Sequence, residues 1–277
     1  MPVINTNVPS LITQNAITRN DKVLSNTMTQ LSTGKRINSA ADDAAGMAIA
    51  TKMTSQIRGL NMATRHANDA ISLIQTAEGG ADAVTSMLQR MRELAVQSAT
   101  DTYSSGDRGL MQAEFSQLRE EISRTATLTN FNGQQLLAEA STLTFQVGAN
   151  SGDTLTYATT NLSEVVSLGG TSVGDTTGAS ISTREGAEAS ISTIDAALDE
   201  VNTERARMGA MINRLGYAGD NLTNIAQNMQ AARSRIEDTE YAAVTRDLAR
   251  SQIIQQAGIA MLAQANQQPQ SVLSLLQ

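Results

Sequence analysis

The residues of this sequence that could take part in catalysis are few, and their spacing fits no reaction. His66 is the only histidine and the chain contains no cysteine, which excludes paired-histidine metalloprotease sites, thiolate zinc sites and cysteine nucleophiles. A Ser-His-Asp triad would have to use His66, and no spacing indicates partners for it. We therefore interpret His66 as a solvated helical residue and predict no enzyme, no cofactor and no metal site.

Two motifs look like ligand sites but have simpler structural explanations. The Gly34-Lys35 pair follows the order of a phosphate-binding loop, yet that loop also needs a glycine five residues before the pair and a serine or threonine after it. The sequence has Thr29 and Arg36 at those positions. For the Asp42-Asp43 pair, we predict carboxylates that accept hydrogen bonds from free N–H groups at a helix start rather than a cation site.

The composition favours long helices over a compact globule. Aromatic residues make up 3% of the chain and tryptophan is absent, so the core must rely on Ala, Leu, Ile and Met, which suit narrow helical bundles. The net charge of -7 argues against nucleic-acid binding. No apolar run is long enough to cross a membrane. The first residues lack the basic and apolar regions of a secretory signal, so any export is expected to proceed without a cleaved leader.

A long helical seam is the strongest periodic signal. Within residues 184–236, apolar residues repeat at alternating intervals of three and four, interrupted only by Arg205 and Gly219, which is typical of a coiled-coil-like seam. Two shorter apolar stripes precede it, and the segment from Ser104 to Asp107 supplies a turn and a helix cap between them. We predict a helical hairpin over residues 60–128 that packs against the long helix.

The only β signal lies in the middle of the chain. Leu143, Phe145 and Val147 alternate with polar residues, a turn-forming segment follows, and the alternation then resumes. We predict a β-hairpin region at about residues 140–168. The residues after it are rich in Gly, Ser and Thr and indicate a surface loop, so no additional outer domain is expected.

These signals together predict a mainly α fold. It would consist of a long antiparallel helical rod, coiled-coil-like, with one small β-hairpin region and a terminal two-helix coiled coil. We place an inner, discontinuous domain at residues 1–42 and 237–277 and an outer helical rod domain at residues 43–236.

Both ends of the chain are nearly free of charge. Residues 1–18 and 251–277 hold no Asp, Glu, Lys or Arg, yet they carry apolar residues at helical spacing. Terminal segments fray unless they are tied down, so we expect the two ends to bury each other or to pack against neighbouring copies of the chain. The residues predicted for this assembly coiled coil are Ile4, Val8, Leu11, Leu24, Leu31, Ile254, Met261, Ala265, Val272 and Leu275.

Four segments of the sequence carry motifs of one protein family. The segment Leu31-Ser-Thr-Gly-Lys-Arg-Ile-Asn-Ser-Ala-Ala-Asp-Asp-Ala-Ala-Gly-Met47 is similar to the N-terminal signature of bacterial flagellin. Gln89-Arg-Met-Arg-Glu-Leu-Ala-Val-Gln97 resembles its first hairpin segment, Asn130-Phe-Asn-Gly133 its helix-to-hairpin corner, and Ser234-Arg-Ile-Glu-Asp238 with the Gln-rich tail its C-terminal region. The likeness covers about residues 1–140 and 185–277 and is to a short flagellin without variable outer domains.

The resemblance implies a structural subunit that polymerises into the extracellular flagellar filament for motility. It also implies export of the unfolded chain through the flagellar type III apparatus, an export chaperone that masks the C-terminal helix, and contacts with the filament cap and hook-associated proteins. The terminal helices are expected to be disordered in the monomer and to fold on assembly. Neither nucleic acid nor a membrane is an expected partner.

The resemblance also indicates a surface on the first helical hairpin through which flagellins engage Toll-like receptor 5. By helical spacing, Arg90 and Glu93 point largely away from the predicted core stripe. A solvated face with helical charge pairs, or a contact between protofilaments, would use the same side chains. We predict that the monomer, and not the intact filament, activates the receptor. The predicted recognition and protofilament-contact residues are Gln89, Arg90, Glu93, Leu94 and Glu114.

Two other functions remain alternatives at the level of the sequence. A hook-filament junction protein is another flagellar export substrate with similar ends, but the complete signature at residues 31–47 and the compact middle favour the filament subunit. A secreted enzyme or adhesin carried on such ends would need an inserted domain. Residues 168–183 are too few, and too poor in chemically active side chains, to form one.

Overall fold

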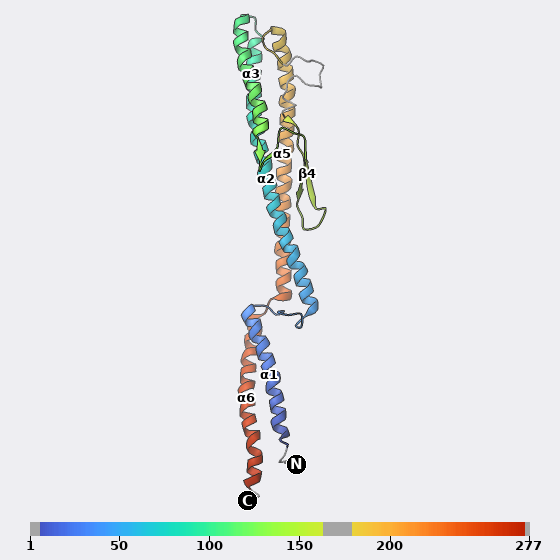
Figure 1. The fold of residues 1–277 in the computed structure, drawn as a ribbon, viewed down its shortest axis with the longest axis vertical. Coiled ribbons are helices and arrows are strands. Elements are labelled where there is room, and N and C mark those ends of the chain that lie inside the picture. The colour runs from blue at the N-terminus through green and yellow to red at the C-terminus, as the bar shows by residue number, and fades with distance from the viewer. Residues whose placement is uncertain (1–5, 163–178, 275–277) are drawn as a thin grey trace. The chain divides into compact units, whose positions relative to one another are not determined.

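The computed structural model describes residues 6–162 and 179–274, and the side chains of residues 268–274 are outside this description. None of the helices within these ranges has the length and mean hydropathy needed to cross a membrane. The predicted mainly α fold is confirmed. The helices are α1 (Val8–Thr33), α2 (Ala44–Ser98), α3 (Ser105–Leu128), α5 (Arg184–Glu237) and α6 (Tyr241–Ser274) (Figure 1).

The chain forms two compact units. One comprises Met1–Ile57 with Gln227–Gln277, and the other comprises Arg58–Ala226. The predicted domain boundaries, at residues 42/43 and 236/237, lie close to the breaks between α1 and α2 and between α5 and α6, and they stay a prediction. Because α2 and α5 continue through the division, each of these helices contributes to both units.

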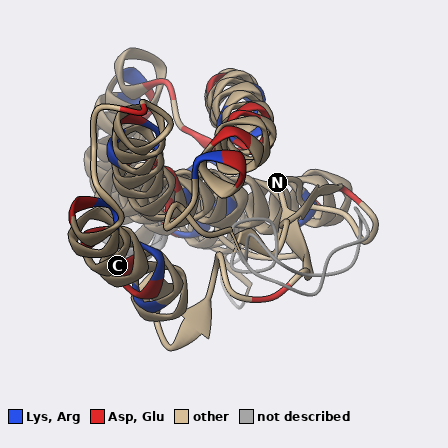
Figure 2. Ribbon diagram, turned by 90° about the horizontal axis from the view of Figure 1, so that it is seen from above, with Lys and Arg blue, Asp and Glu red and all other residues tan. Residues whose placement is uncertain are grey.

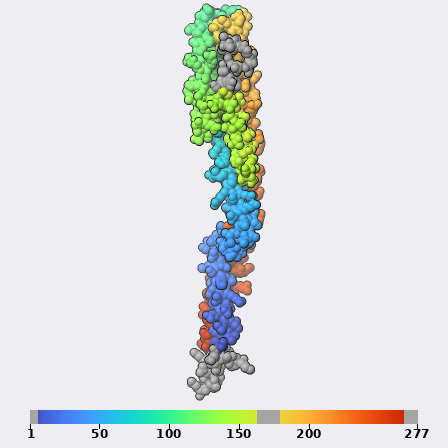
Figure 3. All heavy atoms as spheres, turned by 45° about the vertical axis from the view of Figure 1, so that its right-hand side comes forward, coloured from blue at the N-terminus to red at the C-terminus, as the bar shows by residue number. Residues whose placement is uncertain are grey.

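Within the unit Arg58–Ala226, α2, α3 and α5 lie side by side and a β-hairpin packs against them (Figures 1 and 3). α3 begins with the predicted cap: Ser104 Oγ accepts from Asp107 N at 3.2 Å, and the Asp107 carboxylate accepts from Ser104 N at 3.0 Å. Acidic and basic residues are interspersed along the helices (Figure 2). The core includes Ile74, Leu88, Phe115, Ile122 and Ile194.

The first of two short antiparallel hairpins follows α3 directly. β1 (Asn130–Phe131) pairs with β2 (Gln134–Gln135). Asn132 and Gly133, with φ of 51° and 82°, connect the strands. This left-handed pair is what a type I′ turn requires, and Asn-Gly is its commonest sequence. This corner is the Asn130-Phe-Asn-Gly133 segment that resembles the flagellin helix-to-hairpin corner, and its strands were not predicted.

The second hairpin is the one that the alternation predicted. β3 (Thr142–Gln146) pairs with β4 (Thr154–Ala158), and Leu143 lies opposite Tyr157. This confirms the β-hairpin within the predicted range. The end of that range, from residue 163, lies outside the described residues.

The buried face of α5 differs from the predicted seam at every second position. Val201 and Met208 are buried as predicted, but between them the structure buries Glu204 rather than Arg205. Arg205 instead places Nη2 2.8 Å from Asp82 Oδ1. The predicted seam was wrong here because α5 packs against the β-hairpin as well as against other helices, so its buried face is wider than a two-helix seam.

In the unit formed by the two ends of the chain, α1 and α6 run antiparallel (Figure 1). At the start of α1, Asn7 Oδ1 accepts a hydrogen bond from Ser10 N at 3.2 Å and so caps the helix. The Asn7 Nδ2 group donates a hydrogen bond to the carbonyl oxygen of Ala265 on α6 at 2.9 Å. At the end of α1, Gly34 takes the left-handed cap conformation, and its carbonyl oxygen accepts from Thr239 N at 3.0 Å. The predicted terminal two-helix coiled coil is therefore confirmed.

Candidate assembly and recognition surfaces

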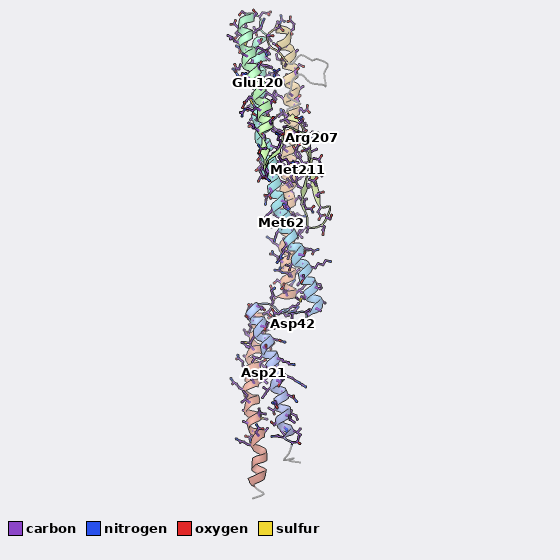
Figure 4. The ribbon with its side chains drawn as sticks, viewed as in Figure 1. Asp21, Asp42, Met62, Glu120, Arg207 and Met211 are labelled. Atoms are coloured by element: carbon purple, nitrogen blue, oxygen red, sulfur yellow. The ribbon has the colours of Figure 1, made fainter. Side chains whose placement is uncertain are left out.

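The seam between α1 and α6 combines apolar residues with polar contacts. Asn20 is 8% exposed, and its Nδ2 donates to the carbonyl oxygen of Ser251 at 2.8 Å. Gln255 Nε2 donates a hydrogen bond to Asp21 Oδ1 at 3.0 Å. Asp21 lies on α1 (Figure 4). A polar residue at a coiled-coil core position fixes the register of the helices at a cost in stability. We therefore interpret this seam as specifying the alignment of α1 and α6 more than the strength of their pairing.

The seam follows the spacing of a heptad repeat on both helices. At one point the helices approach closely, because a Cβ atom on Gly258 would lie 2.9 Å from Cγ1 of Ile17. The buried and half-buried seam residues are Ile17, Asn20, Leu24, Thr27 and Leu31 on α1, and Val244, Leu248, Ser251, Gln255, Gly258, Leu262 and Ala265 on α6.

The residues predicted for the assembly coiled coil divide between the seam and the outer surface. Those in the seam are Leu24, Leu31 and Ala265. Those exposed outside it are Val8 (49%), Leu11 (52%), Ile254 (45%) and Met261 (64%). Ile4, Leu275 and the side chain of Val272 lie outside the described part of the chain. Of the two alternatives expected for the ends, pairing within one chain accounts for the seam set, and packing against neighbouring copies stays a prediction for the exposed set.

Each terminal helix consequently has two faces of different character. The face toward the partner helix carries Asn, Thr, Ser and Gln among its apolar residues, whereas much of the apolar area points outward. Large apolar side chains that remain exposed on a helix pair are unusual unless another surface covers them. The further exposed apolar residues of these helices are Ile12, Val23, Met28, Ile253 and Ile259.

The linker between α1 and α2 is paired with the linker between α5 and α6. Lys35 and Asp238 form an antiparallel β-bridge, and Arg36 N donates to the carbonyl oxygen of Glu237 at 2.7 Å. The Arg36 guanidinium Nη2 donates to the carbonyl oxygen of Ile236 at 2.7 Å, so it satisfies a free acceptor at the end of α5. Lys35 Nζ forms an ion pair with the Glu237 carboxylate.

The Asp42-Asp43 pair stabilises the turn that leads into α2. Asp43 Oδ1 accepts from Gly46 N at 2.8 Å, which confirms the predicted helix-start role for this residue. Asp42 accepts from the backbone N–H groups of Ser39 and Asn38, and these two bonds, the first the stronger, lower the pKa of its carboxyl group. Among the described residues, no three His, Asp or Glu side chains gather as a metal site.

The predicted recognition residues occupy the outer faces of α2 and α3, with one exception. Gln89, Arg90, Glu93 and Glu114 are exposed. Arg90 joins the two helices, since its Nη1 lies 2.9 Å from Glu93 Oε2 and its Nε 3.0 Å from Glu114 Oε1. Hydrogen bonds to Glu93 and then to Glu114 raise the pKa of Arg90. Leu94 is 2% exposed and belongs to the core beneath this surface. In the free chain it therefore supports the surface from below and is not one of its exposed contact residues.

An open groove of about 560 Å³ lies beside Arg90 on α2. Arg92 lines it and makes a two-pronged ion pair with Asp195 of α5, with Nε–Oδ1 and Nη2–Oδ2 distances of 2.6 and 3.2 Å. This pair orients the guanidinium along the wall of the groove. The lining residues are Gln89, Arg92, Glu93, Val96 and Gln97.

Sequence reasoning missed the buried carboxylate of Glu204 on α5. It accepts hydrogen bonds from the hydroxyl groups of Tyr157, on β4, and Thr160, the latter at 2.9 Å. Arg207 Nη1 lies 3.4 Å from the same carboxylate. Glu204 occupies a core position one residue away from the predicted stripe, and a search for polar residues at that shifted register would have found it.

Comparison with known proteins gives one consistent result. Residues 4–142 match the "bacterial flagellin N-terminal helical region" and residues 191–276 match the corresponding C-terminal helical region. A flagellin of Halalkalibacterium halodurans is 46% identical over 278 residues, and the flagellar filament 33 kDa core protein of Treponema phagedenis is 42% identical over 285 residues; each alignment covers 99% of both chains. The crystal structure of Bacillus cereus flagellin matches with 31% identity and a TM-score of 0.51, over 61% of this chain and 94% of that one.

Proposed function

This chain belongs to the bacterial flagellin family, the structural subunits of the flagellar filament, and we propose that it polymerises through the exposed apolar faces of α1 and α6. The family is structural rather than enzymatic, and the filament that it builds is extracellular. The observation that carries the proposal is the exposure of Val8, Leu11, Ile254 and Met261 on helices whose mutual seam mixes polar and apolar residues.

Burial of these faces by neighbouring subunits supplies the driving force for assembly. Removing apolar surface from water contributes roughly 25 cal/mol per Å². No Asp, Glu, Lys or Arg lies within residues 1–18 or 251–277, so a neighbour can cover these segments without desolvating a charge. Ile4, Val272 and Leu275 remain predicted assembly residues.

The seam also supports coupled folding and assembly. Polar residues interrupt the apolar ones in the seam between α1 and α6, and the apolar ones are only half-buried within one chain. Much of the stability of the pair should therefore come from neighbours that cover its outer faces. We therefore infer that the terminal segments are disordered in the free subunit and fold as it joins the filament. Disordered ends suit export of the unfolded chain by the flagellar type III apparatus. An export chaperone would mask α6 until then, and the cap and hook-associated proteins would meet the same surfaces at the filament's ends.

Seeded elongation by purified protein tests the assembly surface. Ile254→Asp should slow elongation by at least about tenfold, because a charge would be buried against a neighbour. Ile254→Leu, the matched control, keeps the surface apolar and should elongate normally. Normal elongation by Ile254→Asp would contradict the proposed surface. Unmodified protein that never extends filament seeds would favour the hook-filament junction alternative.

The α2–α3 surface around Arg90 is proposed to recognise Toll-like receptor 5 in the free subunit and to contact a neighbouring protofilament in the filament. Its support is the exposed cluster of Gln89, Arg90, Glu93 and Glu114 beside a groove. Arg90→Asp should abolish receptor activation by the monomer. Arg124→Asp is the matched control, because Arg124 is an exposed arginine paired with Glu121 within α3. Equal loss in both variants would contradict a specific role for Arg90.

A further inference from the structure

All of the oxidisable sulfur in this chain is methionine sulfur. There are 12 methionines and no cysteine, so a peroxide that reaches the protein finds thioethers as its sulfur targets. Oxidation of a thioether converts a flexible apolar side chain into a polar one. Its effect on function therefore depends on where the exposed methionines lie.

The described methionines differ sharply in exposure. Met91, Met208 and Met211 are at most 5% exposed and belong to the core. Met261 on α6 and Met28 on α1 are 64% and 55% exposed. Peroxide should therefore reach the second group while the first is protected.

The two most exposed of these thioethers lie on the terminal helices. Met261 follows Ile254 by seven residues, which places both on one face of α6, the face proposed to meet a neighbouring subunit. Met28 lies four residues after Leu24 and three before Leu31, so it flanks the α1 side of the seam. Both thioethers face solvent whether or not the terminal helices are paired in the free subunit.

We propose that Met28 and Met261 are oxidation sites whose conversion to sulfoxides prevents the free subunit from joining a filament. This inference rests on the proposed assembly surface. In the reaction, the sulfur attacks one peroxide oxygen, the O–O bond breaks, and a methyl sulfoxide and water are formed. The sulfur is oxidised by two electrons and hydrogen peroxide is reduced. Burial of a sulfoxide against an apolar neighbour then opposes assembly, by about tenfold for each site.

Subunits already in a filament should escape this modification. A neighbouring subunit that covers Ile254 also covers Met261, so peroxide has no access to the thioether. Methionine oxidation would thus affect subunits before they assemble and leave the existing filament intact.

The test exposes purified monomer to dilute hydrogen peroxide, locates sulfoxides by peptide mass measurement and follows seeded elongation. Met28 and Met261 should oxidise before Met91 and Met208, and elongation should fall by at least about tenfold. The double variant Met28→Leu, Met261→Leu, compared with its own untreated protein, should lose no elongation rate on the same treatment. Met62→Leu is the matched control, because Met62 is 40% exposed on α2 (Figure 4), and this variant should remain as sensitive as the unmodified chain.

Reversal gives a second readout that does not depend on variants. Treatment of oxidised monomer with methionine sulfoxide reductases should restore elongation. Full elongation with sulfoxides present at both sites would overturn the proposal, and so would equal loss of elongation in the double leucine variant. If Ile254→Asp blocks elongation while oxidation does not, the oxidation proposal alone fails; if neither has an effect, the assembly surface itself is wrong.

Discussion

The hydroxyl group of Tyr157 donates a hydrogen bond to the carboxylate of Glu204, and this contact ties the β3–β4 hairpin to helix α5. Both side chains are buried. A buried carboxylate is costly unless donors satisfy it, and here Thr160 supplies a second donor. The contact therefore positions the hairpin as well as stabilising it.

Removal of the phenol hydroxyl should loosen the hairpin. Tyr157→Phe leaves Glu204 with one donor fewer and should lower the free energy of unfolding by about 1–3 kcal/mol. Tyr217→Phe is the matched control, since Tyr217 is 77% exposed and should have little effect. Urea denaturation of the free subunit measures both. Identical midpoints for the two variants would show that the Tyr157 contact contributes nothing.

The same contact predicts a loss of stability at alkaline pH. Burial, followed by the hydrogen bond to Glu204, raises the pKa of Tyr157 above that of an ordinary phenol. The folded phenol stays protonated while the unfolded one ionises at about pH 10, so the stabilisation is present below that pH and declines above it. Denaturation midpoints should therefore fall more steeply above pH 10 in the unmodified chain than in Tyr157→Phe. Parallel curves would contradict this assignment.

Gly34 should tolerate no side chain. Its φ is 70°, and an added Cβ atom would lie 3.0 Å from the hydroxyl oxygen of Tyr241. Gly34→Ala should destabilise the terminal unit by about 1–2 kcal/mol because of the left-handed backbone alone. Gly109→Ala, in open space on α3, should be neutral or stabilising. The melting temperatures of assembled filaments compare the two, and a stable Gly34→Ala filament would refute the prediction.

The close approach of α1 and α6 should show compensation between two residues. Gly258→Ala places a methyl group 2.9 Å from Ile17 Cγ1 and should weaken the helix pair by about 1–3 kcal/mol. Adding Ile17→Ala to it should recover part of the loss, although Ile17→Ala alone removes packing. Filament melting temperatures for the full double-mutant cycle measure the coupling. Additive effects would mean that these residues do not meet in the filament.

The sequence predicted the helices, the main hairpin and the terminal helix pair because each rests on a local pattern of spacing or turn chemistry. It did not predict which apolar residues face which partner. Glu204 is buried because α5 meets the hairpin as well as α2, a contact that no periodicity along α5 records. On α6, Ile254 and Met261 dominate the apolar pattern, yet Ser251 and Gln255 face α1. A sequence read as one chain does not distinguish a face meant for its own partner helix from one meant for a neighbouring copy.

The bridge between Lys35 and Asp238 has a mechanical consequence. A filament subunit bears torque. Here the two chain segments that connect α1 and α6 to the rest of the chain are hydrogen-bonded to each other. Neither linker can stretch without shearing its hydrogen bonds to the other, including the bond from Arg36 to Ile236. A twist applied to α1 is thus transmitted to α6 through these hydrogen bonds. The two linkers therefore carry load together and not independently.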